Sequence, residues 1–177
     1  MDARPPWSET IRLGELARGP VLRRLEAGEA ARRAVARHLG LVALDRLEAD
    51  LALAPWLDGA QIEGGFVAEA IQTCGVTGEA FPERIEGRIA LRVLPEGSPN
   101  APQGAGEEID LDPEAEDPPD LLEGDLIDLA AYVVEHLSLE LDPFPRKPGA
   151  VFSPPEERGE ISPFAVLATL SKTPPEG

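Results

Sequence analysis

Hydrophobic and polar positions alternate most regularly between residues 82 and 94. From Ile85 onward every second residue is apolar or glycine, and most of the residues between them are charged. A period of two is typical of a β-strand with one side in a core and the other in water. We therefore predict a strand over 82–94. Its buried side carries Ile85, Gly87, Ile89, Leu91 and Val93, and its exposed side carries Arg84, Glu86, Arg88, Ala90 and Arg92.

A hairpin joins this strand to the segment before it. The stretch Gly75-Val76-Thr77-Gly78 separates it from a second predicted strand over 66–73. Glycines at both ends of so short a stretch indicate a turn. The pair Gly64-Gly65, just before the first strand of the hairpin, predicts a bulge or a bend. We expect the two strands to be antiparallel neighbours.

Residues 42–54 fit two periods. Their leucines alternate with polar residues as in a strand, but Leu44, Leu47 and Leu51 also fit one face of a helix. We interpret the segment as a strand because Pro55 closes it and further strands follow.

A helix is predicted over 28–39. Ala31, Val35 and Leu39 recur there at every fourth position among good helix formers, and Gly40 supplies a stop.

Two further helices are predicted in the last third of the chain. Residues 125–129 indicate a short strand that runs into a helix, with Asp128 as its N-cap and Pro143 beyond its end. A final helix begins at Ser162, has proline at its first position, and continues to Leu170. It is too short to be stable alone and is expected to dock on the rest of the protein.

The remaining segments predict extended or flexible chain. Residues 7–13 indicate a short strand or arm. Residues 95–120 are rich in proline, glycine and acid, so we expect a flexible acidic loop, and residues 143–160 form a loose proline-rich segment. Residues 1–177 are expected to form one α+β domain. It consists of an antiparallel sheet, open or barrel-like, with a few packed helices.

Charge is distributed unevenly along the chain. The net charge is −17, which favours basic partners and disfavours nucleic acid at long range. Residues 1–46 nevertheless carry 9 basic and 6 acidic side chains, whereas residues 96–142 carry 15 acidic and no basic ones. The protein is therefore expected to have one region that meets anions and another that meets cations.

These two regions supply most of the candidate binding residues, and the predicted strand over 82–94 supplies three more. Arginine suits phosphate geometry, so the arginines of the first helix and of the strand over 82–94 are predicted to contact RNA. An ordinary solvated surface is the alternative. The acidic residues are predicted to hold a basic partner. The RNA candidates are Arg32, Arg33, Arg37, Arg84, Arg88 and Arg92, and the acidic candidates are Asp110, Asp112, Glu114, Glu116 and Asp117.

Little in the sequence indicates catalysis, a metal or a cofactor. A calcium loop beginning at Asp110 would need glycine where Ala115 stands and glutamate where Leu121 stands. Cys74 is the only cysteine, so neither a disulfide nor a zinc site is predicted, and we expect a small buried thiol. No signal peptide or membrane span is predicted, so the expected location is the cytoplasm. A hydrolase that uses Cys74 remains the enzymatic alternative.

Three stretches resemble the YceD family of small bacterial proteins, also called DUF177. The hairpin from Ile71 to Phe81 resembles the family's strand, cysteine and turn. The segment 125–129, with the helix and Pro143 after it, is similar to a second element. The ending from Ser162 to Leu170 is close to the family's "NPFAVLAxLK", with serine in place of asparagine. The order and spacing of the resemblance fit over most of the chain, from about residue 7 to 172.

The resemblance implies a role in ribosome biogenesis. The family is linked to accumulation of the large (23S-type) ribosomal RNA, which implies a non-enzymatic factor that binds this RNA, a basic ribosomal protein, or both. Many members carry paired cysteines around the hairpin, and this chain has only Cys74. Any metal or redox role of such pairs is therefore not carried over. A protein adaptor without nucleic-acid contact is the other non-enzymatic hypothesis.

Overall fold

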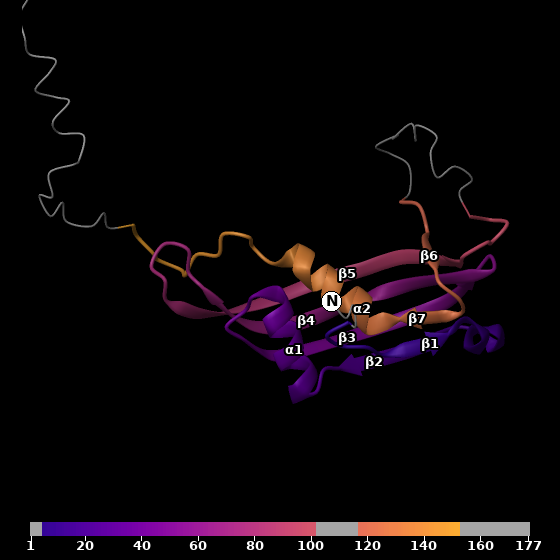
Figure 1. Ribbon diagram of the computed structural model, residues 1–177, viewed down its shortest axis with the longest axis horizontal. Helices are drawn as coiled ribbons and strands as arrows, with labels where there is room; N and C mark the ends of the chain where they lie inside the picture. The colour runs from indigo at the N-terminus through magenta and orange to yellow at the C-terminus, as the bar shows by residue number, and fades with distance from the viewer. Residues whose placement is uncertain (1–4, 102–116, 153–177) are drawn as a thin grey trace, which may run out of the picture.

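The computed structural model describes residues 5–101 and 117–152. They form an α+β fold on a five-stranded sheet (Figure 1). In spatial order its strands are β2 (Val21–Glu26), β3 (Ala43–Trp56), β4 (Gly59–Thr73), β5 (Ala80–Pro95) and β6 (Asp120–Leu122). Neighbours are antiparallel except β5 and β6, which are parallel. The predicted α+β class is confirmed, and within the described residues the sheet is open rather than closed into a barrel.

Three long strands form the body of the sheet. β4 pairs with β3 on one side and with β5 on the other along nearly its whole length. The strict alternation of their sequences gives the sheet an apolar inner face, with rows such as Leu47, Ala68 and Ile85. The outer face carries the alternate residues, including the arginines predicted to be exposed: Arg84, Arg88 and Arg92.

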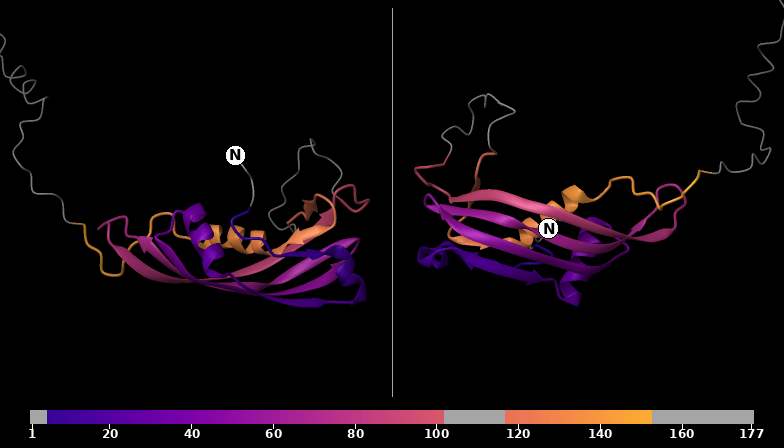
Figure 2. Two further views of the ribbon diagram at one scale, coloured as in Figure 1. Left: turned by 60° about the horizontal axis from the view of Figure 1, so that its bottom comes forward. Right: turned by 180° about the vertical axis from the view of Figure 1, so that it is seen from behind.

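A second layer covers the inner face. It consists of a small sheet of β1 (Thr10–Arg12) and β7 (Leu126–Asp128), the 3-10 helix η1 (Leu13–Arg18), and helices α1 (Glu29–Leu39) and α2 (Leu129–Glu140). Figure 2 shows the helices on one side of the curved sheet. The core between the layers is mainly aliphatic, and its fully buried side chains include Ile11, Leu47, Leu53, Ile62, Ile89, Val133 and Leu137. Within residues 5–101 and 117–152, binding surfaces therefore lie on the outer face, at the sheet edges or on the exposed sides of the helices.

Both described helices begin as the sequence predicts. α1 follows Gly28 and ends at Gly40, whose φ of 70° is left-handed. At α2 the Asp128 carboxylate accepts a hydrogen bond from the amide of Ala131 at 3.2 Å. The same carboxylate also accepts one from the amide of Glu9 at 3.0 Å. The cap of α2 therefore also fixes the N-terminal arm.

Of the bulge or bend predicted at Gly64-Gly65, the bulge is wrong. β4 passes through these residues without a change of register, and the irregularity lies in β3 between Leu44 and Arg46. The glycines are needed for space instead. A Cβ atom on Gly64 would lie 2.1 Å from the carbonyl oxygen of Asp50 on β3. A glycine pair in a strand thus indicates close approach here and not an inserted residue.

Several boundaries differ from the predictions. Within 7–13 only Thr10–Arg12 is a strand, and η1 follows immediately. The strand predicted over 66–73 begins earlier, at Gly59, and β2 was not predicted. The flexible loop predicted over 95–120 is too long at both ends, because Pro95 belongs to β5 and Asp120 to β6. A short strand such as β6 has too few residues to show a period of two.

Some predicted segments lie outside the described residues. These include the helix from Ser162 to Leu170 and the acidic residues Asp110, Asp112, Glu114 and Glu116. The segment predicted to be loose over 143–160 is described as far as Phe152 and contains no helix or strand there. It returns to the hairpin turn, where the amide of Gly75 donates to the carbonyl oxygen of Pro145 at 2.8 Å.

The close contact at Gly64 leads to a stability prediction. A methyl group in Gly64→Ala would collide with backbone, which cannot rotate away, so we expect the free energy of unfolding to fall by about 1–3 kcal/mol. Gly14→Ala is the control, because nothing lies within 4 Å of its added Cβ. Denaturant unfolding of both variants measures the difference. Equal stability of the two would contradict the close packing of β3 on β4.

Candidate functional site

The arginine row of α1 lies beside a shallow cavity of about 350 Å³ between the helix and the start of β3. The three side chains differ in their engagement. Arg32 donates to the carbonyl oxygen of Ala27 at 2.8 Å, and Arg33 pairs with Glu29 at 3.1 Å. Arg37 is exposed and makes no ion pair with a described residue. Arg33 and Arg37 are therefore the members of the row best placed to meet a phosphate, since the Glu29 pair is solvent-exposed and weak.

The arginines of β5 lie in a different setting. Arg84 is within 3.6 Å of Glu69 and 2.6 Å of Glu86. Glu69 is also 3.7 Å from Arg46, so the charges form a ladder across three strands. On the outer face as a whole, five arginines from β2 to β5 stand among six carboxylates: Arg24, Arg46, Arg84, Arg88 and Arg92 with Glu26, Glu48, Asp50, Glu63, Glu69 and Glu86. This face is therefore electrostatically balanced and is not a basic patch.

The two predicted arginine groups do not form one surface. α1 packs on the inner side of the sheet through buried Val35 and Ala36, whereas the β5 arginines project from the outer face. Arg92 in addition lies over the ring of Trp56, with its guanidinium carbon 5.0 Å from the ring centroid. A single stretch of RNA phosphates would have to pass around the edge of the sheet to touch both groups.

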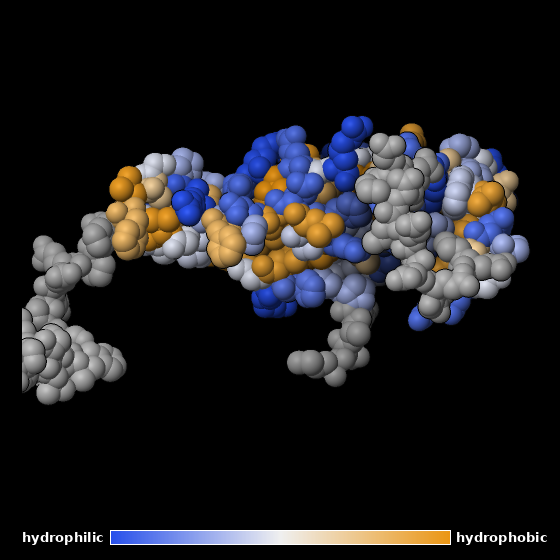
Figure 3. All heavy atoms as spheres, turned by 90° about the horizontal axis from the view of Figure 1, so that it is seen from above, coloured by the Kyte–Doolittle hydropathy of each residue, from blue (hydrophilic) through white to orange (hydrophobic). Residues whose placement is uncertain are grey.

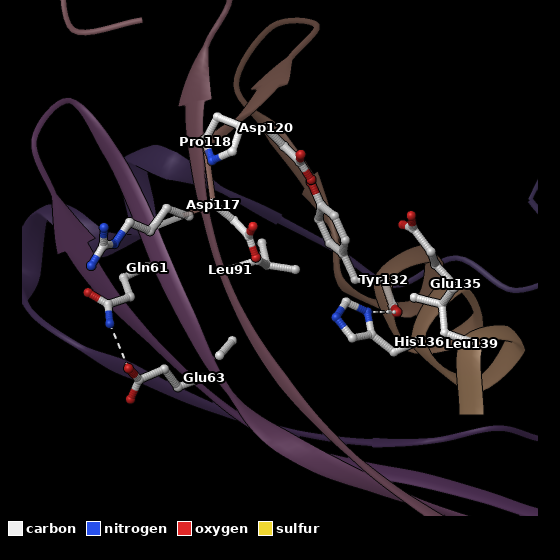
Figure 4. A pocket seen from close by; sticks show the side chains of 12 residues that line it. Gln61, Glu63, Leu91, Asp117, Pro118, Asp120, Tyr132, Glu135, His136 and Leu139 are labelled. Atoms are coloured by element: carbon white, nitrogen blue, oxygen red, sulfur yellow. Dashed lines mark hydrogen bonds between the residues drawn. The ribbon is translucent and has the colours of Figure 1, made fainter. Parts of the chain in front are cut away.

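A cavity of about 500 Å³, lined by described residues, lies at the edge of β5. We call it the edge groove. One wall is a stripe on α2 formed by Tyr132, Glu135, His136 and Leu139 (Figure 4). The opposite wall includes Gln61 and Glu63 of β4, with residues 90–92 of β5 beneath them and Asp117, Pro118 and Asp120 at one end.

The groove combines an apolar strip with negative charge. Leu139 is 75% exposed beside the half-buried Tyr132, and four of the lining residues are carboxylates: Glu63, Asp117, Asp120 and Glu135. Burial raises the pKa of Tyr132, and the neighbouring Asp120 carboxylate raises it further, so the phenol stays protonated at neutral pH. His136 lies with Nδ1 2.9 Å from the carbonyl oxygen of Tyr132.

Sequence reasoning located this site only in part. Of the predicted acidic residues, Asp117 is described and lies in the groove. Tyr132 and His136 are half-buried and line the groove, whereas Val133 and Leu137 are fully buried. The spacing of Tyr132, His136 and Leu139 by three and four residues is itself a helical stripe. It was hidden because α2 has apolar residues on more than one side.

Cys74 directly follows the end of β4 and is buried, as predicted. Its Sγ accepts a hydrogen bond from the amide of Lys147 at 3.4 Å, and Lys147 Nζ pairs with Glu79 at 3.0 Å. Hydrogen bonds from the Thr77 side chain, and then from backbone amides, lower the pKa of the Cys74 thiol to about 7. The thiol is thus partly ionised at neutral pH but enclosed by the turn and by the segment after α2.

The described residues offer few other chemical groups. No three histidine, cysteine or acidic side chains converge there in a way that could hold a metal ion. In the same ranges, no helix is long and apolar enough to cross a membrane.

Comparison with known proteins finds no matching family model, curated protein or solved structure. The resemblance to the YceD family therefore stays a prediction from the three stretches quoted above.

The environment of Cys74 makes a pH-dependent prediction. Because the folded protein lowers the thiol pKa from 9.0 to about 7, thiolate formation stabilises the fold above pH 9, and this contribution is lost as the pH falls through 7. Relative to Cys74→Ala, we expect wild-type stability to rise between pH 7 and 9. Thr77→Val should raise the pKa, measured from the ultraviolet absorbance of the thiolate. An unchanged pKa would contradict the assigned hydrogen bond.

Proposed function

We propose that this protein is a non-enzymatic factor in assembly of the large ribosomal subunit and that it acts in the cytoplasm. It would support accumulation of the large ribosomal RNA by binding that RNA, a basic ribosomal protein, or both. The resemblance to the YceD family suggests the role in ribosome assembly. The separation of positive and negative surfaces on the protein supplies the physical argument. An assembly factor that brings RNA and a basic protein together needs surfaces of opposite sign.

The observation that carries the proposal is the placement of the two surfaces. The arginine row of α1 lies next to the start of β3, whereas the edge groove lies at the far side of the sheet, beyond β4. Bound anionic and cationic partners would therefore be held apart by the width of the sheet. They would not neutralise each other's sites.

The proposed binding of RNA rests mainly on the arginines of α1. Arg33 and Arg37 are exposed, while the β5 arginines share their face with an equal or larger number of carboxylates. That balance favours a second candidate function, a protein adaptor that makes no nucleic-acid contact. The two candidates make different predictions for purified RNA.

RNA binding by α1 predicts a defined salt dependence. Replacing Arg33 and Arg37 by glutamine should weaken binding of single-stranded ribosomal RNA and reduce the slope of log affinity against log salt by about 1.4, since each phosphate contact contributes about 0.7. Arg84→Gln with Arg88→Gln is the matched control and should change the slope less. Filter binding over a range of salt concentrations measures both. Salt-independent binding, or no binding at all, would favour the adaptor.

A role in assembly predicts a cellular defect. Cells that lack the protein should accumulate less large-subunit RNA relative to small-subunit RNA, and the tagged protein should sediment with large-subunit precursors. Quantifying both RNAs, and sedimenting extracts with and without RNase, provides the measurement. Cys74→Ala should restore the RNA ratio fully, which would also remove the thiol-hydrolase alternative. A normal RNA ratio in the deletion strain would overturn the proposal.

A further inference from the structure

In the part of the chain that the structure describes, one edge of β5 is unpaired along much of its length. On one side it pairs with β4 from Ala80 to Val93, but on the other side β6 covers only Val93–Pro95. Between Arg84 and Ala90 the described residues form no backbone hydrogen bond to that second side. An exposed strand edge is a template for pairing with another extended chain.

The direction of the backbone groups can be read from the pairing. The amide of Glu96 donates to Leu122 on the β6 side at 2.9 Å. Because β5 pairs with β4 without a register shift, every second residue of β5 points its amide and carbonyl to the same side. The even-numbered residues therefore point these groups, like Glu96, toward the β6 side. These residues are Arg84, Glu86, Arg88, Ala90 and Arg92. Pro82 is also an even-numbered residue of β5. Proline has no amide hydrogen, which fits a position that donates no hydrogen bond to β4.

The edge groove lies directly along this edge. Glu140, at the end of α2, is close to Gly87, and the α2 stripe continues past residues 90–92 toward Asp120. A chain paired with β5 would therefore rest one side of its residues against Leu139 and Tyr132. Figure 3 views the molecule from the β5 side of Figure 1 and shows apolar surface between hydrophilic patches there.

Charge indicates which chain would fit. The groove lining carries four carboxylates against one arginine, and that arginine is already placed over Trp56. An acidic peptide would be repelled, whereas lysine or arginine side chains would meet Glu63 on one wall and Glu135 on the other. Alternation of basic and apolar residues would satisfy the charged rim and the apolar strip together.

We propose that the β5 edge binds an extended basic peptide segment of a partner protein by β-strand addition, continuing the line begun by β6. The inference rests on the protein-binding half of the proposed function and specifies how that partner is held. Backbone pairing with Arg84 to Ala90 supplies affinity, and the carboxylates and the apolar strip select the sequence.

The test uses the full chain and a short labelled peptide in which lysine and valine alternate. Fluorescence anisotropy should show saturable binding that weakens with salt, and the matching glutamate–valine peptide should not bind. Ala90→Pro removes one amide hydrogen that points away from β4. Pro82 shows that β5 accepts proline at such a position. We expect it to weaken binding about tenfold. Ala90→Val keeps the amide and should bind like the wild type.

Two further variants test the inference if Ala90→Pro does not fold. Glu63→Gln combined with Glu135→Gln should weaken binding about tenfold and reduce its salt dependence. Leu139→Ser should weaken binding, whereas Leu22→Ser, which changes an equally exposed leucine on β2, should not. Thermal unfolding of each variant confirms that it is folded.

Three results would overturn the inference. They are absence of binding to the basic peptide, unchanged binding by folded Ala90→Pro, and equal binding of a lysine–valine peptide methylated on alternate backbone nitrogens. Displacement of the peptide by a peptide of residues 160–172 at lower concentration would assign the edge to the chain's own segment instead. Displacement by RNA at lower concentration would assign it to nucleic acid. The cellular RNA ratio is independent of all these results, so the proposed function can fail separately.

Discussion

The one-sided burial of β3, β4 and β5 is the constraint on which the rest of the structure depends. Their alternation creates one face that must be covered and one that need not be. Glycine at two inner positions gives neighbouring strands of the sheet the space they need: Gly64 of β4 lies against the backbone of β3, and Gly87 of β5 leaves room for the ring of Phe66 on β4. The helices and the small β1–β7 sheet therefore pack on the inner face and cover it. Among the described residues, the outer face, the edges and the exposed helix sides remain for binding.

The charges follow this division. On the outer face arginines and carboxylates alternate across strands and form ion pairs, which keeps the bare face polar. Each such exposed pair contributes little stability, about 0–1 kcal/mol. The unbalanced charges lie elsewhere, on α1 and around the edge groove. The arginines of β5 form the most conspicuous arginine pattern in the sequence. Their face of the sheet is nevertheless less suitable for RNA than the arginine row of α1.

The sequence predicted those features that depend on a repeated local pattern. The two long hairpin strands, α1 with its glycine stop and α2 with its Asp128 cap all follow from period and capping. β2 and β6 did not, because short edge strands are defined by their partners and not by their own residues. The edge groove was missed for the same reason: α2 and β5 are far apart in sequence, and only the fold places Leu139 beside Ala90.

The open edge of β5 is the central structural claim, and amide hydrogen exchange in the free protein tests it most directly. The account predicts alternation along the strand. The amides of Ile85, Gly87 and Ile89, which point to β4, should be protected, while those of Glu86, Arg88 and Ala90 should exchange quickly. Uniform slow exchange across all six amides would mean that the edge is already covered and would contradict the account.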